Sequence, residues 1–129
     1  MRKLFLFLLA SVLMTTSAIA QNNTGRQEKL LRHVVLFKFT AASTENDVRR
    51  VEDAFRNLPK LIKEIHSFEW GKNNSPENLN QEFTHCFFVT FTSEADRAAY
   101  LPHAAHLAFV EVLKPHLDKV LVIDYWAEK

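Results

Sequence analysis

LRHVVLFKF, residues 31–39, is the stretch that decides the fold of this chain. Its β-branched and aromatic residues are typical of a β-strand. Successive side chains of a strand point to opposite faces, and here both faces are largely apolar. One face carries His33, Val35, Phe37 and Phe39, and the other carries Val34 and Leu36. Any sheet that contains this strand must therefore be covered on both sides.

The residues that follow predict an amphipathic helix. From Thr44 onward, a 3-4-3 spacing of apolar residues is typical of one buried helical face, formed by Val48, Val51, Phe55 and Leu58. The charged residues between Glu45 and Asp53, Glu52 among them, are expected to form the solvated face. Pro59 is expected to end or kink the helix.

A second helical region is predicted nearer the C-terminus. Ser93 is a suitable N-cap, with Asp96 three residues on as its capping-box partner, and this helix is expected to reach about Leu101. Pro102 is expected in the first turn of a new helical segment, where its missing N–H costs nothing. That segment runs to Leu113.

Three more strands complete the pattern. They are predicted at Ile65–Trp70, Thr84–Phe91 and Val120–Trp126, with a turn-forming loop from Lys72 to Glu82. The order β-α-β-β-α-β is typical of a ferredoxin-like α+β sandwich, in which helices cover one face of a four-stranded antiparallel sheet. We expect the first and third strands to be parallel neighbours at its centre.

That topology leaves one sheet face without a cover. Val34, Leu36, Cys86 and Phe88 line this face, and an exposed apolar patch of this kind usually marks an interface. A homodimer is the simplest partner. Cys86 is the only cysteine, so no disulfide forms within the chain.

The N-terminus has the layout of a secretory signal peptide. Arg2 and Lys3 precede the apolar run Leu4–Met14, and Ala18-Ile19-Ala20 provides a cleavage site after Ala20. The run is shorter than the roughly 20 apolar residues that span a bilayer. We therefore expect a signal peptide at residues 1–20, a polar tether at 21–29 and one domain at 30–127, exported to a periplasm or secreted and free of the membrane after cleavage.

The charge balance argues against nucleic acid as the main partner. Without Arg2 and Lys3, 14 of the 16 basic residues remain against 15 acidic ones. Nucleic-acid-binding domains normally carry a basic patch instead.

The candidate site centres on Tyr100, His103 and His106, which recur at three-residue intervals. His106 falls early in the last helical segment, where the positive N-terminal field disfavours imidazolium. A neutral histidine can remove a proton next to a carbonyl while a tyrosine donates to the oxyanion. His33 and His85, near the starts of two neighbouring strands, are expected to face the same cavity, together with Phe37 and Phe87.

Three functions stay open on this evidence. The chain is a binding protein for a small apolar, aromatic or polyketide-like compound, a cofactor-free cyclase or lyase, or a structural stress protein whose histidines do no chemistry. Four histidines are in principle zinc ligands (His33, His85, His103 and His106). Since no Cys pair or HExxH motif accompanies them, we expect neither a metal nor another cofactor.

Five blocks of sequence together resemble the stress-responsive dimeric α/β-barrel (Dabb) family over Leu31–Trp126. They are LRHVVLFKF, FEWGKNNSPE, FTHCFFVTFTS, YLPHAAHLAFVEVLKP and VLVIDY. The resemblance implies ferredoxin-like subunits whose sheets pair into a barrel across a two-fold axis. Some members are stress-induced plant proteins, and one branch closes polyketide chains by a metal-free aldol step.

In that branch, the resemblance assigns catalysis to Tyr100 and His106 and ligand binding to His33, His85 and His103. The family's usual His-Pro-x-His stretch reads His103-Ala104-Ala105-His106 here, without the proline.

Overall fold

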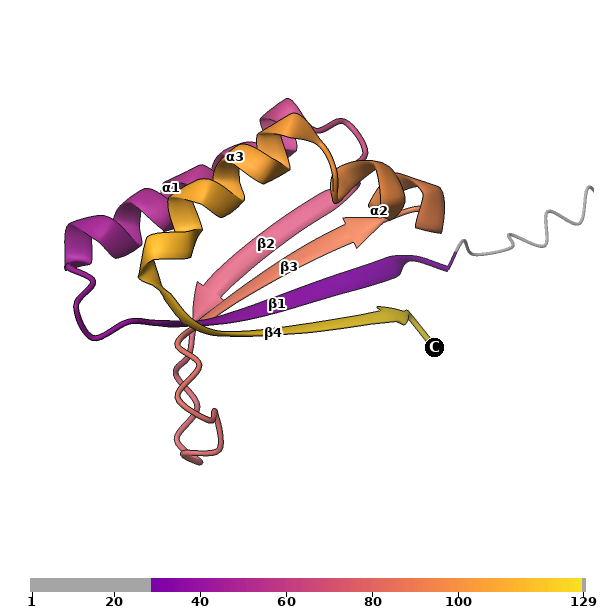
Figure 1. Ribbon diagram of the computed structural model, residues 1–129. Helices are drawn as coiled ribbons and strands as arrows, with labels where there is room; N and C mark the ends of the chain where they lie inside the picture. Colours follow the sequence, from indigo (N-terminus) through magenta and orange to yellow (C-terminus); the bar gives the residue numbers. More distant parts are fainter. Residues whose placement is uncertain (1–28, 129) are drawn as a thin grey trace, which may run out of the picture.

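Four strands form one sheet, and three helices cover one of its faces (Figure 1). The computed structural model describes residues 29–128, so the predicted signal peptide and all but the last residue of the tether lie outside the described residues. The elements are β1 (Leu31–Phe39), α1 (Glu45–Leu61), β2 (Ser67–Lys72), β3 (His85–Phe91), α2 (Glu94–Tyr100), α3 (Ala104–Leu113), the 3₁₀ helix η1 (Lys114–His116) and β4 (Leu117–Trp126). This is the ferredoxin-like α+β fold that the sequence predicts.

The central strands β1 and β3 run antiparallel, so the prediction that they are parallel was wrong. The strand order is β2-β3-β1-β4, and every neighbouring pair is antiparallel. The crossover through α1 makes β2 run in the same direction as β1, and the following hairpin reverses the chain into β3. Within this register His33 pairs with Val89 and His85 pairs with Phe37.

His33 and His85 are therefore not neighbours, contrary to the prediction. Both side chains lie on the helix-covered face, but Val89, the partner of His33, is four positions from His85 along β3. At about 3.4 Å per residue, this places them about 14 Å apart along the strand. The two histidines belong to opposite ends of the sheet.

Local signals fix the start of α1. The Thr44 side chain accepts a hydrogen bond from Asp47 N at 3.2 Å, and Asp47 Oδ2 accepts one from Thr44 N at 2.9 Å. This reciprocal capping box satisfies two backbone donors at the helix end. Pro59 does not end α1, which continues to Leu61. Since Pro59 lies in the last turn, its missing N–H removes only one bond of the ladder, and Ile62 N still donates to Leu58 O at 2.9 Å.

The boundary between α2 and α3 differs from the prediction by two residues. Ser93 caps α2 as predicted, accepting from Asp96 N at 3.0 Å. Pro102 does not lie in the first turn of α3, because α3 begins at Ala104 and His103 is its N-cap. The His103 ring accepts a hydrogen bond from Ala105 N at 3.1 Å, and this bond sets the helix start one residue after the cap.

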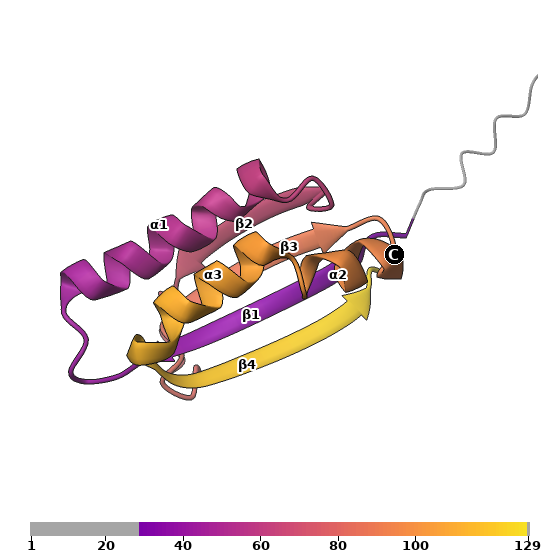
Figure 2. The same ribbon diagram turned by 45° about the horizontal axis from the view of Figure 1, so that its top comes forward.

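A cluster of phenylalanines fills the space between the sheet and the helices α1 and α3, which lie side by side over it (Figure 2). Phe55 of α1 stacks on Phe87 of β3 with ring centroids 4.2 Å apart and an interplanar angle of 4°. Phe109 of α3 meets Phe55 edge-on at 4.7 Å, and Phe37 of β1 lies 5.3 Å from Phe87. All four rings are buried. We call these four residues the aromatic core.

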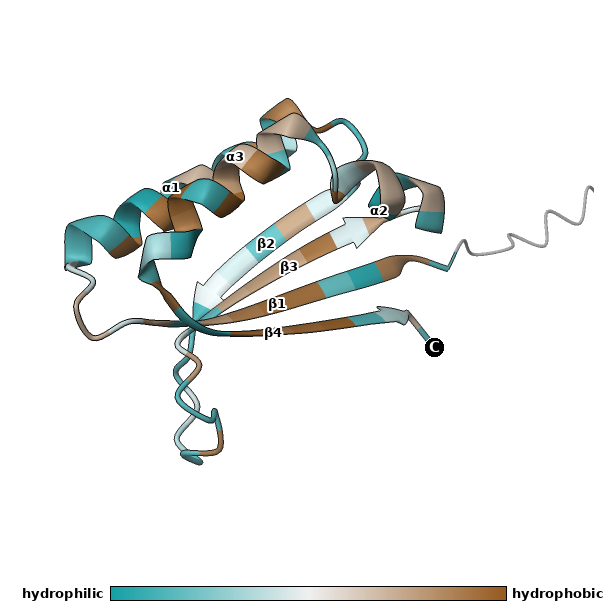
Figure 3. Cartoon of the chain, viewed as in Figure 1, coloured by the Kyte–Doolittle hydropathy of each residue, from teal (hydrophilic) through white to brown (hydrophobic). Residues whose placement is uncertain are grey.

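The opposite face of the sheet has no cover, as predicted. Val34, Leu36, Cys86 and Phe88 are half-buried on it. The register adds three exposed residues of the edge strand β4 to this open face, namely Leu121, Ile123 and Tyr125. Apolar residues colour β1, β3 and β4 brown in Figure 3, and the loop between β2 and β3 projects from the side away from the helices (Figure 1). None of the helices within residues 29–128 is long and apolar enough to cross a membrane.

Candidate functional site

The structure divides the five predicted site residues between two places. His33, Tyr100 and His106 meet at one end of the helix-covered face, with His103 capping the same helix as His106. His85 lies at the other end, beside Glu52 and Lys72. The aromatic core occupies the space between the two groups. The prediction of one cavity shared by all five residues was therefore wrong, because the antiparallel register separates the two strand histidines.

Tyr100 and His106 are in direct contact. Tyr100 ends α2 and is buried, and His106 lies in the first turn of α3 with its ring centroid 4.4 Å from that of Tyr100. His106 Nδ1 is 2.9 Å from the carbonyl oxygen of Leu101. A carbonyl only accepts, so Nδ1 must carry the hydrogen, and in the neutral ring Nε2 keeps its lone pair. His33 lies edge-on to Tyr100 at 5.8 Å.

Burial sets the charge states of this pair. Burial is the main cause that lowers the pKa of His106, and the nearby His33 and His103 lower it further against the opposing effect of the Leu101 carbonyl. Burial also raises the pKa of Tyr100, so its hydroxyl stays protonated. The pair therefore offers a neutral base and a neutral hydrogen-bond donor at neutral pH.

Asp124 and Arg97 extend this group, and the sequence analysis missed both. Asp124 Oδ1 accepts from His33 Nδ1 at 2.7 Å, while its Oδ2 accepts from Arg97 Nη1 at 2.7 Å. Asp124 is the direct β4 partner of His33, which brings it to the helix-covered face. The sequence did contain a signal for Asp124, because it is the one acidic residue in the otherwise apolar strand predicted at residues 120–126. The carboxylate fixes the ring of His33 through Nδ1.

We call His33, Tyr100, His106, Asp124 and Arg97 the Tyr100 cluster. Two apolar side chains adjoin it on the same face of β4. Val120 and Val122 pair with Phe37 and Val35, respectively, yet both remain half exposed because β4 lies at the sheet edge. A polar cluster and an accessible apolar strip thus lie side by side.

His85 has a different environment from the one predicted. His85 and Glu52 are each only 7% exposed. His85 Nε2 lies 2.9 Å from Glu52 Oε1, and its Nδ1 lies 2.8 Å from Thr84 Oγ1. Both ring nitrogens are engaged within the chain, so a ligand reaches neither without breaking a bond.

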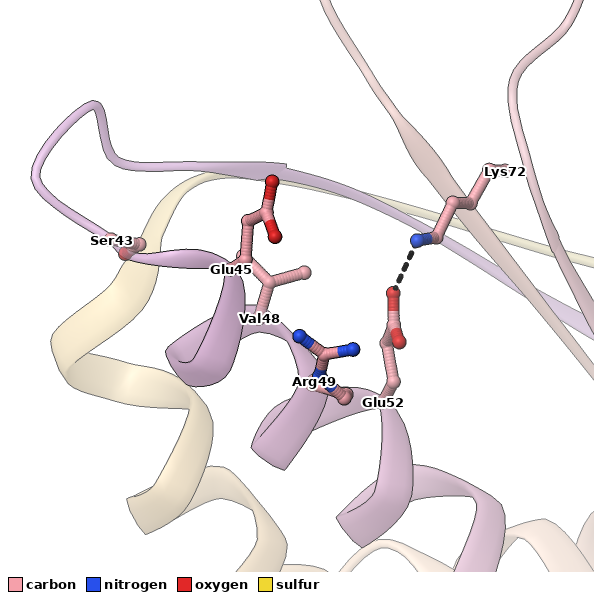
Figure 4. Close-up of a pocket in the computed structure, with 6 residues that line it drawn as sticks. All are labelled: Ser43, Glu45, Val48, Arg49, Glu52 and Lys72. Carbon is pink, nitrogen blue, oxygen red and sulfur yellow. Dashed lines mark ion pairs between the residues drawn. The ribbon is translucent and has the colours of Figure 1, made fainter.

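Glu52 was predicted on the solvated face of its helix, and the structure corrects this. It follows Val51 and precedes Phe55 by three residues, at the border of the apolar stripe, and the helix turns it toward His85. Lys72 Nζ lies 3.1 Å from the same carboxylate oxygen (Figure 4). Burial alone raises the pKa of Glu52, but the hydrogen bonds with His85 and Lys72 outweigh it and hold the pKa below its usual value.

Metal-binding geometry is not found in the described part of the chain. Within residues 29–128, no three His, Cys, Asp or Glu side chains group as the ligands of a metal ion.

The lowered pKa of His106 predicts a pH-dependent stability. In the unfolded chain His106 binds a proton near its ordinary pKa of 6.5, whereas in the folded chain it does so only at lower pH. Unfolding therefore takes up a proton at pH values between the folded and unfolded pKa of His106. The free energy of unfolding is unaffected by the titration of His106 above pH 6.5, and it falls as the pH decreases from 6.5 toward the pKa of the folded state. Urea denaturation should show a shallower pH dependence for His106→Gln, whose amide can still donate to Leu101. Identical pH profiles for the two proteins would contradict the assignment.

Comparison with known proteins identifies the family. Residues 31–127 match the Stress responsive A/B Barrel Domain, Dabb. The chain is 40% identical over 95 residues to stress-response A/B barrel domain-containing protein HS1 of Arabidopsis thaliana, which covers 74% of this chain and 87% of HS1. It is also 29% identical over 99 residues to olivetolic acid cyclase of Cannabis sativa, which covers 77% of this chain and 98% of the cyclase.

Solved structures agree with this match. A crystal structure of an Arabidopsis thaliana protein, 38% identical, superimposes with a TM-score of 0.72 and covers 77% of this chain and 96% of that one. A dimeric protein with a ferredoxin-like fold from Bacteroides fragilis, 24% identical, has a TM-score of 0.63 and covers 76% and 96% of the two chains. This protein belongs to the stress-responsive A/B barrel (Dabb) domain family.

Proposed function

We propose that this protein is a homodimeric small-molecule-binding protein of the Dabb family, whose ligand presents a carbonyl or phenol group to Tyr100 and His106. The observation that carries the proposal is the contact between a protonated tyrosine and a histidine whose Nε2 is an acceptor. A phenol donates to such a nitrogen, and a carbonyl accepts from the tyrosine hydroxyl. His33 and His103 lie nearby as further polar contacts for the same group.

The apolar part of the ligand has one accessible surface next to this group. The aromatic core fills the interior between α1, α3 and the sheet. Val120 and Val122 of β4 remain half exposed beside Asp124 and His33. We infer an aromatic or polyketide-like ligand that places its apolar part along β4.

A cofactor-free cyclase or lyase is the second candidate. His106 Nε2 removes a proton from the carbon next to a carbonyl, and Tyr100 donates to the enolate oxygen that forms. The enolate carbon then attacks a second carbonyl of the same molecule, and the new alkoxide takes the proton back. The orientation of His106 favours this candidate, as does similarity to a protein named olivetolic acid cyclase.

Binding of an aromatic hydroxyketone tests the site. We expect His106→Gln and Tyr100→Phe to weaken binding of 2-hydroxyacetophenone by about tenfold each, the loss of one hydrogen bond of about 1.4 kcal/mol. Isothermal titration calorimetry measures the affinity. His66→Gln is the matched control, since His66 is exposed and lies outside the Tyr100 cluster. Affinities equal to that of the wild type in all three variants would exclude the site. A polyketone that cyclises with the wild type but not with His106→Gln would establish the enzymatic candidate.

The open face of the sheet is the proposed dimer interface. Burial of apolar surface contributes about 25 cal/mol per Å², and the dimeric Bacteroides fragilis structure supports this assembly. We expect Ile123→Lys to shift sedimentation toward the monomer mass, because a charge would be buried between the sheets. Leu61→Lys is the matched control, since Leu61 is 55% exposed on α1 and Ile123 is 50% exposed on the open face. A wild-type monomer at micromolar concentration would contradict the proposal.

Export remains a proposal that rests on the N-terminal sequence. Cleavage after Ala20 would release a periplasmic or secreted chain that begins at Gln21. Mass spectrometry of the protein from its native source should find Gln21 at the N-terminus. Finding Met1 on the soluble protein would reject this processing.

A further inference from the structure

A polar pocket lies at the other end of the molecule, away from the Tyr100 cluster. It has a volume of about 390 Å³ and lies between the start of α1 and the end of β2. Its lining consists of Ser43, Glu45, Val48, Arg49, Glu52 and Lys72 (Figure 4). Glu45, Arg49 and Glu52 share one face of α1, because residues three and four apart on a helix are neighbours.

Glu52 presents one carboxylate oxygen to this pocket. Its contacts with His85 and Lys72 both use Oε1. Within the described residues no buried side-chain oxygen or nitrogen lacks a hydrogen-bond partner. Only 7% of the Glu52 surface is exposed. Its Oε2 atom therefore reaches the pocket surface as an acceptor on an otherwise buried, ionised group.

Two further charged side chains line the pocket without a partner of opposite charge in the described part of the chain. Arg49 Nη2 donates to the amide oxygen of Asn46 at 3.3 Å. Within residues 29–128, neither Arg49 nor Glu45 forms an ion pair. Lys72 is 63% exposed and uses one of its ammonium hydrogens on Glu52, so two hydrogens remain for another acceptor.

Charge complementarity selects the class of ligand. A simple cation would face Arg49 and Lys72 as well as the carboxylates, and a simple anion would face Glu45 and Glu52 as well as the basic groups. A molecule that carries both charges satisfies both sides. We propose that this pocket binds a small ammonium carboxylate such as a free α-amino acid, with its ammonium group on Glu52 Oε2 and Glu45 and its carboxylate on Arg49 and Lys72.

His85 is a positioning residue for this site. Its Nε2 holds Glu52 Oε1, and Thr84 holds the other side of its ring. This arrangement keeps Oε2 directed to the pocket. The amino-acid site is independent of the Tyr100 cluster, because the aromatic core lies between them.

Titration of the ¹⁵N-labelled protein with L-alanine, ethylamine and propionate tests the proposal. L-Alanine carries both charges, ethylamine carries only the ammonium group and propionate carries only the carboxylate. L-Alanine is expected to give saturable shifts of the backbone amide resonances of Glu45, Arg49, Glu52 and Lys72, with an affinity about tenfold above that of either single-charge probe. No saturable shift with L-alanine, or equal affinity for ethylamine or propionate, would overturn the proposal.

Two variants separate the pocket from general electrostatics. Arg49→Gln should weaken L-alanine binding by about tenfold, the effect of one lost charge-assisted hydrogen bond. Arg50→Gln makes the same charge change one residue along α1, outside the pocket lining, and should leave the affinity unchanged. Equal losses in both variants would overturn the proposal. Since Arg49 is exposed, its replacement tests the pocket without disturbing the buried Glu52–His85 pair.

Discussion

Phe55 of α1 lies flat on Phe87 of β3 at 4.2 Å, and this stacked pair belongs to the apolar layer that joins the helices to the sheet. With Phe37 and Phe109, the two rings fill the centre of the layer between helices and sheet. Polar side chains are excluded from this centre, because burying one there without a partner costs free energy. The ionisable groups of the helix-covered face therefore collect at its two ends.

The sequence was sufficient to predict the elements and the fold class. Alternating and helical apolar patterns located β1, α1 and β3 within a residue or two, and Thr44 and Ser93 were recognisable caps. The relative direction of β1 and β3 followed from topology rather than from either segment, and the sequence analysis assigned it incorrectly. Because of that error, His85 was predicted to lie next to His33, whereas the observed register separates them.

The sequence predicted part of the candidate site, namely Tyr100 and His106 on neighbouring helices and His33 on the first strand. Tyr100 and His106 are six positions apart and meet through a short turn. Asp124 and Glu52 each depend on a partner from a distant segment, since Asp124 binds His33 across the β1–β4 pairing and Glu52 binds His85 between a helix and a strand. The charge of Glu52 indicated solvent exposure, and only its partners His85 and Lys72 explain why it is buried.

The histidines at the two ends of the helix-covered face differ in how many of their ring nitrogens are hydrogen-bonded within the chain. At one end, His85 uses both ring nitrogens, on Glu52 and Thr84, so its hydrogen-bonding capacity is spent on holding a carboxylate. At the other end, His106 uses only Nδ1, on a backbone carbonyl, and burial keeps it neutral beside a protonated tyrosine. A histidine that removes a proton during a reaction needs a ring nitrogen with a free lone pair. His106 keeps Nε2 free, whereas both ring nitrogens of His85 are engaged, so we propose proton transfer for the Tyr100 cluster and recognition of charge for the Glu52 end.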